Sequence, residues 1–174
     1  MRLPLLVLVL FAALPAQAQY APNSTGIGLM AVPGNETLRL DPQLGIGLGG
    51  TRQIGVGSWS WMYRGVIAVT QAVDDPSRAT LIPAWVSTGL RYDLSEDRLR
   101  PFAILSGTYY QLTNPPAGFT AGVYMAGAGL RLGVEQYLAT EISVQFDVGG
   151  SWFLQLDSAD PLIADAVLGL KVHY

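Results

Sequence analysis

The chain ends with Leu168-Gly169-Leu170-Lys171-Val172-His173-Tyr174, in which apolar residues alternate with small or polar ones up to a final aromatic residue. A period of two predicts a β-strand with one apolar and one polar face. The same period recurs along the rest of the chain, and no stretch carries the 3.6-residue period of an amphipathic helix. The sequence therefore predicts an all-β protein.

Eight segments carry this alternation, with Gly, Pro, Asp and Asn in the stretches between many of them. Ile142, Val144 and Phe146, for example, alternate with polar residues. One segment is ambiguous, because Phe102 and Ile104 compete with Leu105 for the apolar face. The expected strands lie near residues 24–32, 38–49, 56–72, 80–92, 99–112, 120–133, 138–154 and 162–174.

The composition favours a barrel in a membrane over a soluble sandwich or a lipocalin-like barrel. Apolar residues make up 50% of the chain and charged residues 13%, against roughly 25% charged in a soluble domain. Gly45 and Gly47 lie on the polar face, as suits the narrow interior of an eight-stranded barrel. The outer wall of such a barrel is apolar because it faces lipid. We expect Leu44, Ile46, Val144, Phe146 and Leu168 on that wall.

Aromatic residues lie toward the strand ends, where the two lipid–water interfaces would select them. One expected belt contains Trp59, Trp61, Tyr92, Phe102, Tyr137 and Tyr174, and the other contains Tyr109, Tyr110, Tyr124, Trp152 and Phe153.

The N-terminus has the pattern of a secretory signal. An apolar run from Leu3 to Leu14 follows Arg2 and precedes Ala16-Gln17-Ala18. At about 12 residues, the run is too short to span a bilayer as a helix. The sequence predicts a cleavable signal peptide over residues 1–18 and one barrel domain over residues 19–174.

Two stretches resemble the periplasmic hairpins of the small OmpA/OmpX-type outer-membrane barrels. They are Gly89-Leu90-Arg91-Tyr92-Asp93-Leu94 with Leu99-Arg100-Pro101-Phe102, and Gly127 through Leu138, which contains Gly133-Val134-Glu135-Gln136-Tyr137. The final Tyr174 is similar to the terminal aromatic residue that the barrel-insertion machinery of that family reads as an assembly signal. We expect no peptidoglycan-binding domain after it.

The resemblance implies an eight-stranded antiparallel up-and-down transmembrane β-barrel in the outer membrane of a Gram-negative cell envelope. Its expected partners are outer-membrane lipid, lipopolysaccharide and, during assembly, the insertion machinery. With both termini in the periplasm, the connections divide into two sets. Periplasmic turns are expected near 50–55, 93–98 and 134–138, and outward loops near 33–37, 73–79, 113–119 and 155–161.

Several motifs point to chemistry only weakly. Residues 45–50 match G-x-G-x-x-G, but a dinucleotide site needs a helix after this turn, so the glycines are expected to pack in the lumen. The only histidine, His173, lies at the periplasmic end, away from lipopolysaccharide, and is expected to be hydrogen-bonded rather than catalytic.

Metal and nucleic-acid sites also lack support. Asp74-Asp75 and Asp157 with Asp160 could bind Ca²⁺ or Mg²⁺, but their spacing matches no known loop, and solvated carboxylates are favoured. The chain has no cysteine, which excludes disulfides and thiolate metal sites. No basic patch suits nucleic acid. We therefore expect no catalytic residue, cofactor or metal.

The charged residues on the polar faces form the main candidate site. They balance at four acidic and four basic side chains, which favours an ionic core over an ion path or gate because a narrow lumen cannot hold unpaired charges cheaply. Cross-strand pairs are expected between Asp41 and Arg64 and between Glu141 and Arg131. The full set is Asp41, Arg64, Arg91, Arg131, Glu141, Asp147, Asp165 and Lys171.

These patterns favour a monomeric, porin-like but non-enzymatic barrel with a packed, charged lumen and a structural or interaction role. One alternative is a narrow channel for ions or small solutes, which conductance would reveal. A lipid-modifying outer-membrane enzyme is the third reading, and the position of His173 argues against it.

Overall fold

The computed structural model describes residues 21–34, 40–55, 57–71, 80–113, 124–154 and 162–174. The predicted signal peptide, residues 1–18, lies outside the described residues. The strands are β1 (Ser24–Val32), β2 (Gln43–Gln53), β3 (Trp59–Gln71), β4 (Thr80–Asp93), β5 (Leu99–Thr113), β6 (Tyr124–Tyr137), β7 (Ile142–Leu154) and β8 (Leu162–His173).

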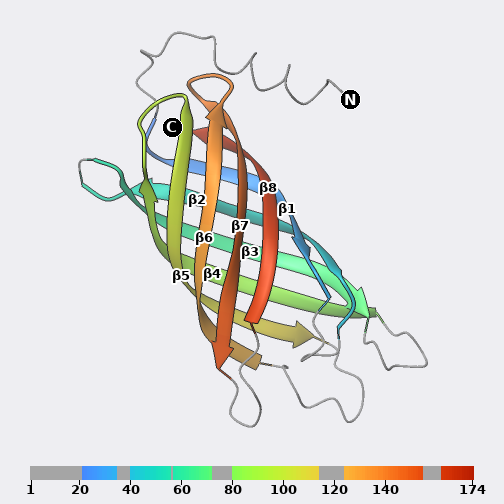
Figure 1. Cartoon of the computed structure of the whole chain (residues 1–174). Helices are drawn as coiled ribbons and strands as arrows, with labels where there is room; N and C mark the ends of the chain where they lie inside the picture. Colours follow the sequence, from blue (N-terminus) through green and yellow to red (C-terminus); the bar gives the residue numbers. More distant parts are fainter. Residues whose placement is uncertain (1–20, 35–39, 56, 72–79, 114–123, 155–161) are drawn as a thin grey trace, which may run out of the picture.

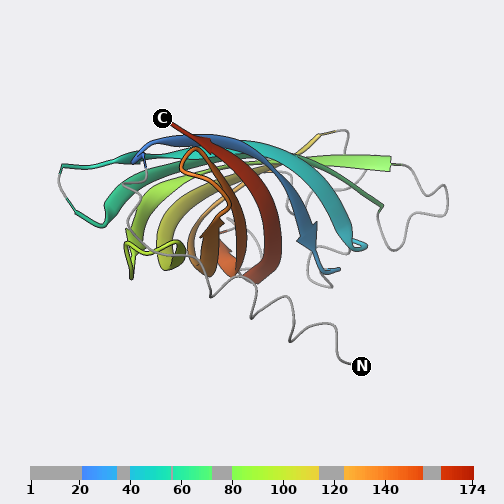
Figure 2. The same cartoon turned by 90° about the horizontal axis from the view of Figure 1, so that it is seen from above.

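The eight strands form one closed barrel in which each strand pairs antiparallel with its neighbour in sequence (Figure 1). β1 pairs with β8 from Ser24↔His173 to Ala31↔Ala166 and closes the ring, so the blue and red strands lie side by side (Figure 2). No helix among the described residues is long and apolar enough to cross a membrane. The predicted eight-stranded antiparallel barrel is confirmed.

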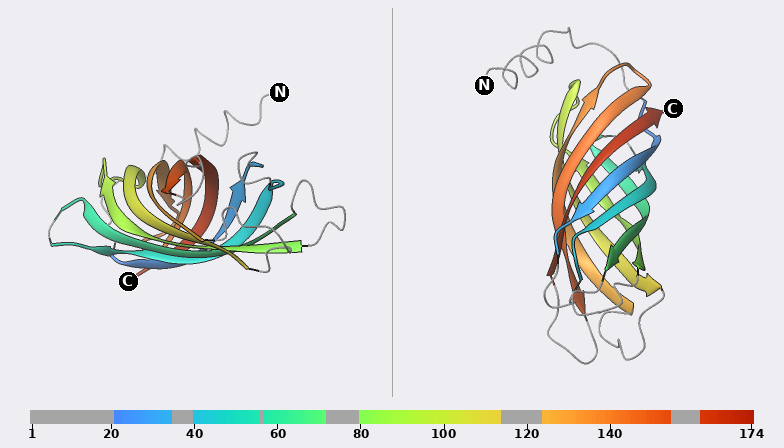
Figure 3. Two further views of the ribbon diagram at one scale, coloured as in Figure 1. Left: turned by 90° about the horizontal axis from the view of Figure 1, so that it is seen from below. Right: turned by 90° about the vertical axis from the view of Figure 1, so that its right-hand side faces the viewer.

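Three short connections, residues 54–58, 94–98 and 138–141, lie at one end of the barrel, which we call the turn end. Figure 3 (right) shows this end at the top. The opposite end, the loop end, carries the strand ends that flank residues 35–39, 72–79, 114–123 and 155–161.

The first and third turns lie later in the chain than predicted. β2 continues through Gln53, and its turn contains Gly55 (φ 67°) and Gly57 (φ 115°), which adopt the left-handed conformation that glycine allows. β6 likewise continues through Tyr137, and Leu138 N donates to the Ile142 carbonyl at 2.9 Å. The predicted turns at 50–55 and 134–138 are wrong.

Glycines lie inside these strands as well as in the turns, so glycine does not mark the strand ends. Gly133 remains in β6, and a Cβ atom at this position would overlap the ring of Phe102 and the side chain of Asp147. Glycine in a strand interior often marks such a close approach. These glycines therefore make room for large lumen side chains instead of ending the strand.

Alternation separates an exposed apolar wall from a buried interior. Leu44, Ile46, Phe146 and Leu168 are exposed, and Val144 is half-buried on the same outward face. In the ambiguous strand, β5, Phe102 and Ile104 are buried inside and Leu105 is exposed.

The aromatic belts are smaller than predicted. Four of the proposed members are buried inside the barrel, and the belt assignment is wrong for these: Phe102, Tyr110, Tyr137 and Phe153. They occupy inward positions of their strands, where large rings fill the lumen. The remaining members are exposed: Trp59, Trp61, Tyr92 and Tyr174 at the turn end, and Tyr109, Tyr124 and Trp152 toward the loop end.

The lumen has two chemically different halves. The half toward the loop end is filled by a cluster that we call the apolar layer, in which Trp85 packs edge-on to Tyr110 with their ring centroids 5.1 Å apart. The half toward the turn end contains the buried charges. The apolar layer consists of Met30, Val32, Leu40, Val66, Ala68, Leu81, Trp85, Tyr110, Leu112, Met125, Phe153, Ile163 and Val167.

Candidate functional site in the barrel lumen

Six of the eight predicted charged residues point into the lumen. Arg64 is half-buried there, and the other five are buried: Arg91, Arg131, Asp147, Asp165 and Lys171. They come from β3, β4, β6, β7 and β8, because each lies at an inward position of its strand. Barrel closure brings together side chains that are far apart in sequence.

A central cluster forms around Asp147, whose side chain is fully buried. Arg64 Nη2 donates to Asp147 Oδ2 at 2.9 Å, and Arg131 Nε donates to Asp147 Oδ1 at 2.5 Å. Arg131 also contacts Asp165 with two nitrogens, Nη1 at 2.7 Å and Nη2 at 2.5 Å. Of these two contacts only the one from Nη1 is a hydrogen bond, whereas Arg64 binds Asp147 with both Nη1 and Nη2, at 3.3 and 2.9 Å. A bidentate pair such as that of Arg64 and Asp147 is among the stronger charged interactions in proteins.

A second cluster lies closer to the turn end around Arg91 and Glu135. Arg91 Nη2 lies 2.5 Å from Glu135 Oε2 and 2.7 Å from Asp93 Oδ1. Its guanidinium also stacks over the ring of Phe102, at 4.0 Å from the centroid. Lys171 Nζ lies 3.6 Å from Glu135 Oε2. Glu135 thus serves two cations.

The amide of Gln145 joins the two clusters. Its Oε1 accepts from Arg91 Nη1 at 3.3 Å, and its Nε2 donates to Asp147 Oδ2 at 2.5 Å. An amide suits this position because it has both a donor and an acceptor. The buried charges therefore form one connected polar network across the lumen.

His173 belongs to the edge of this network. Its Nε2 lies 2.7 Å from Ser143 Oγ and 3.2 Å from Glu135 Oε1, and its Nδ1 lies 3.2 Å from Tyr137 Oη. Ser143 is fully buried and donates to Glu135 Oε1 at 2.5 Å. In a nucleophilic site the carboxylate orients the base through its other nitrogen. Here the carboxylate contacts the serine itself, so the geometry is that of a hydrogen-bonded cluster.

The predicted pair of Asp41 and Arg64 is wrong. Asp41 is half-buried at the loop end, where its N–H donates to the Gln71 carbonyl at 2.9 Å. Arg64 pairs across the strands with Gly49. The later position of the β2–β3 turn shifts the register and separates the two residues.

The predicted pair of Glu141 and Arg131 is also wrong. Glu141 is exposed in the β6–β7 turn, where its carbonyl accepts from His173 N at 2.8 Å. Arg131 pairs across the strands with Gly149. Again the turn lies later than expected, so Glu141 lies outside the strand and its inward face.

Two carboxylates that the sequence analysis missed complete the network, namely Glu135 and Asp93. Each lies an even number of residues after an inward arginine on the same strand and therefore points inward too. Glu135 follows Arg131 by four residues, and Asp93 follows Arg91 by two. The alternation identifies both once β4 is extended by one residue to Asp93 and β6 is extended to Tyr137. The network therefore contains four cations, Arg64, Arg91, Arg131 and Lys171, and four carboxylates, Asp93, Glu135, Asp147 and Asp165.

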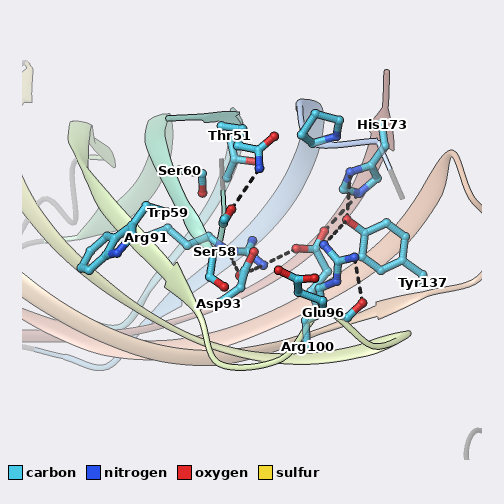
Figure 4. A pocket seen from close by; sticks show the side chains of 14 residues that line it. Thr51, Ser58, Trp59, Ser60, Arg91, Asp93, Glu96, Arg100, Tyr137 and His173 are labelled. Atoms are coloured by element: carbon cyan, nitrogen blue, oxygen red, sulfur yellow. Dashed lines mark hydrogen bonds and ion pairs between the residues drawn. The ribbon is translucent and has the colours of Figure 1, made fainter. Parts of the chain in front are cut away.

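A cavity of about 390 Å³ lies at the turn end, beside the second cluster. Its lining includes the buried Arg91, Glu135, Tyr137 and His173 and the exposed Trp59. Figure 4 shows Arg91, Tyr137 and His173 around the cavity together with Arg100 and Trp59. Deeper in the barrel, the cavities beside Arg64 are much smaller, at about 10 Å³ next to Arg131 and about 40 Å³ next to Gln145. The described part of the lumen therefore narrows sharply from the turn end to its middle.

The structure gives no support for a nucleotide or metal site at the remaining motifs. Residues 45–50 lie within β2, where no helix follows them. Asp74, Asp75, Asp157 and Asp160 lie outside the described residues. In the part of the chain that the structure describes, no three metal-ligating side chains form a group able to hold an ion.

Comparison with known proteins relates the fold to one class of barrels. No protein-family model and no curated protein sequence matches the chain. The crystal structure of OprG from Pseudomonas aeruginosa is similar, with a TM-score of 0.62 and 13% identity over 92% of this chain and 100% of OprG.

Two further solved structures agree. Neisserial surface protein A has a TM-score of 0.59 and 11% identity, over 87% of this chain and 96% of that protein. Ail of Yersinia pestis in a phospholipid nanodisc has a TM-score of 0.55 and 11% identity, over 88% and 99%. The chain has the fold of the small eight-stranded outer-membrane barrels.

Proposed function

We propose that the protein is a non-enzymatic, ion-tight barrel of the Gram-negative outer membrane, with the turn end in the periplasm and a structural or interaction role. Its fold and its exposed apolar wall support residence in a lipid bilayer. The turn-end position of Tyr174 agrees with periplasmic termini.

The apolar layer carries the proposal that the lumen is closed. Its members are all buried, and Tyr110 packs between Trp85 and Phe153 with centroid distances of 5.1 and 6.0 Å. An ion crossing this layer would lose its hydration without gaining a charged partner, which costs several kcal/mol at least. The neighbouring ion pairs are already satisfied by one another, so they offer no free charge to a passing ion.

Planar-bilayer recording tests this proposal. Purified protein is first shown to be folded by heat-modifiable migration in detergent gels, then inserted into a bilayer in salt. The expected result is no steady conductance above the bare bilayer. Steady unit conductance would overturn the closed lumen and favour the channel reading.

A narrow channel for ions or small solutes is the second candidate, and the cavity at the turn end favours it. At about 390 Å³ it would admit a small solute as far as Arg91 and Glu135. Passage beyond that point requires displacement of the apolar layer. The same recordings would detect an ion channel, and a liposome-swelling assay would detect a channel for uncharged solutes.

A lipid-modifying activity receives less support. Ser143 is fully buried beneath His173 and Glu135, so its hydroxyl does not face a substrate. Mass spectrometry of lipid A from cells with and without the protein provides the test. A modification that depends on the protein would overturn the non-enzymatic proposal.

The proposed partners are outer-membrane lipid, lipopolysaccharide and, during assembly, the insertion machinery. Tyr174 is exposed and joined to the barrel through its N–H, which donates to the Asn23 carbonyl at 3.0 Å. Deletion of Tyr174 is expected to slow assembly while leaving the lumen unchanged. Equal assembly rates of the full chain and the deletion variant would show that Tyr174 is not the assembly signal.

We propose that the protein is a monomer, which size analysis in detergent would check.

A further inference from the structure

One outward side chain of the described strands is charged. Arg52 lies near the end of β2 and is exposed on the outward face. Every other outward position of the eight strands, within the described residues, holds an uncharged side chain. The free-energy cost of a charged side chain on a lipid-facing wall decreases from the bilayer midplane toward the headgroups. A charge is therefore tolerated near the interface.

Aromatic side chains surround Arg52 on one side of the barrel. Trp61 lies directly opposite on β3, and Tyr63 and Trp59 flank it on the same face. Tyr92 packs against Trp59 with ring centroids 4.8 Å apart. All four rings are exposed. We call Arg52, Trp59, Trp61, Tyr63 and Tyr92 the rim patch.

The rim patch is specific to β2, β3 and β4. At the same end of the barrel, outward positions of β5, β6 and β7 hold aliphatic side chains, such as Leu99, Val134 and Ile142, while β1 holds Thr25 and the exposed Tyr174 follows β8. Tyr63 is also held in place, because its Oη lies 3.0 Å from Thr25 Oγ1 on β1. Among the exposed aromatic side chains described at this end, only Tyr174 lies outside the rim patch, so the other four rings and the charge of Arg52 lie together on β2, β3 and β4.

An apolar groove lies along the same wall. Its volume is about 280 Å³, and Ile27, Leu29, Ile46 and Leu168 are among its lining residues, all of them apolar or glycine. Ile46 precedes Arg52 by six residues on β2, or roughly 20 Å at the rise of a strand. Leu48, which is exposed between them, gives a continuous apolar path.

These features match the parts of a phospholipid. A guanidinium binds a phosphate through two parallel N–H groups, and indole and phenol rings favour the headgroup level. We propose that the rim patch binds the headgroup of an anionic phospholipid, whose acyl chain follows Leu48 toward the groove. The proposal rests on the membrane orientation proposed above, which places the patch in the periplasmic leaflet.

Quenching of tryptophan fluorescence tests this binding. Trp152 is replaced by Phe because it is exposed near the loop end, whereas Trp85 is buried in the lumen, so Trp59 and Trp61 remain as reporters at the wall. The protein is placed in liposomes that contain a small fraction of either brominated phosphatidylglycerol or brominated phosphatidylcholine. We expect about fivefold preferential quenching by the anionic lipid, the gain for one basic residue near a membrane surface.

Three variants locate the effect. Arg52→Gln should abolish the preference, and Arg52→Lys should keep part of it, since the charge remains without the planar fork. Arg98→Gln is the matched control, because Arg98 binds the Tyr137 and Leu138 carbonyls at the same end of the barrel. It should leave the preference unchanged. Heat-modifiable migration confirms that each variant folds.

Three other outcomes would overturn the inference in different ways. Equal quenching by the two lipids would show that the wall is in lipid but binds no specific headgroup, leaving the proposed function intact. No quenching by either lipid would show that the wall does not face lipid, which would overturn the membrane proposal as well. A preference that persists in Arg52→Gln would remove Arg52 as its source.

Discussion

The two halves of the lumen are built on the same strands and the same alternation, yet they are filled in opposite ways. Toward the turn end, eight charged groups pair with one another around Asp147 and Glu135. Toward the loop end, thirteen buried side chains form the apolar layer. In the half toward the turn end, each buried charged side chain needs a partner of opposite charge. In the half toward the loop end, side chains need only to fill the available volume.

This difference has an energetic consequence. A buried charge that loses its partner retains the cost of its desolvation, whereas a truncated apolar side chain loses only its burial and leaves a cavity. We therefore expect the charged half to tolerate fewer substitutions, although it does not necessarily contribute more to the free energy of unfolding. The following substitutions test that contrast.

The largest expected effect follows from Asp147→Asn. The variant leaves Arg64 and Arg131 beside a neutral amide, and should lose roughly 3–5 kcal/mol of unfolding free energy. Urea unfolding in micelles provides the measurement. Asp97→Asn, in the exposed β4–β5 turn, is the control and should be nearly neutral. A loss below about 1 kcal/mol for Asp147→Asn would show that water screens the central cluster.

Leu81→Ala probes the apolar layer. Leu81 is fully buried, so truncation should cost about 2–5 kcal/mol, depending on how far the layer collapses. The neighbouring Ile82 points outward, and Ile82→Ala should cost less in the same unfolding experiment. Equal losses for the two variants would contradict the assignment of inside and outside in β4.

On the outer wall, the cost of a substitution should depend on its depth in the bilayer and not on which half of the lumen lies behind it. Ile46→Arg places a charge toward the middle of the lipid-facing wall and should cost about 2–4 kcal/mol. Leu99→Arg, at the turn end of β5, should cost little because it lies at the interface. Stability measured by unfolding from lipid vesicles would compare the two. A similar cost at both positions would show that the apolar wall does not follow the bilayer.

A double-mutant cycle sharpens the register of the charged half. Arg64 and Asp147 are in contact, so their coupling energy should lie in the range of about 0.5–3 kcal/mol. The pair of Arg64 and Asp41, which the sequence pattern favoured, should show coupling near zero because Asp41 lies at the loop end. Strong coupling between Arg64 and Asp41, with none between Arg64 and Asp147, would support the register predicted from the sequence.

The smallest expected effect comes from Tyr110→Phe in the apolar layer. The ring is fully buried, and its hydroxyl has no hydrogen-bond partner among the described residues. Removal of this unsatisfied group should leave stability unchanged or raise it by about 1 kcal/mol. A clear loss of unfolding free energy in urea would mean that the hydroxyl has a hydrogen-bond partner in the apolar layer.

Local patterns in the sequence were sufficient to predict the architecture. Alternation is a property of neighbouring residues, so the strand count, the apolar wall at Leu44 and Ile46, and the inward facing of Arg64 and Arg131 could all be deduced from it. The interpretation failed where alternation does not discriminate, because glycine occurs both in turns and inside crowded strands. The predicted strand ends at Gly133, whereas β6 continues to Tyr137 and includes the inward Glu135.

Tertiary structure alone decided which charges meet. Arg64 and Asp147 are 83 residues apart, and no local pattern connects them. They pair because the closed barrel brings β3 and β7 to opposite sides of a lumen narrow enough for an arginine to cross. The same closure joins Arg91 to Glu135 and gathers the apolar layer at the loop end. Sequence determined which face each side chain occupies, while turn positions and ring closure determined its partner.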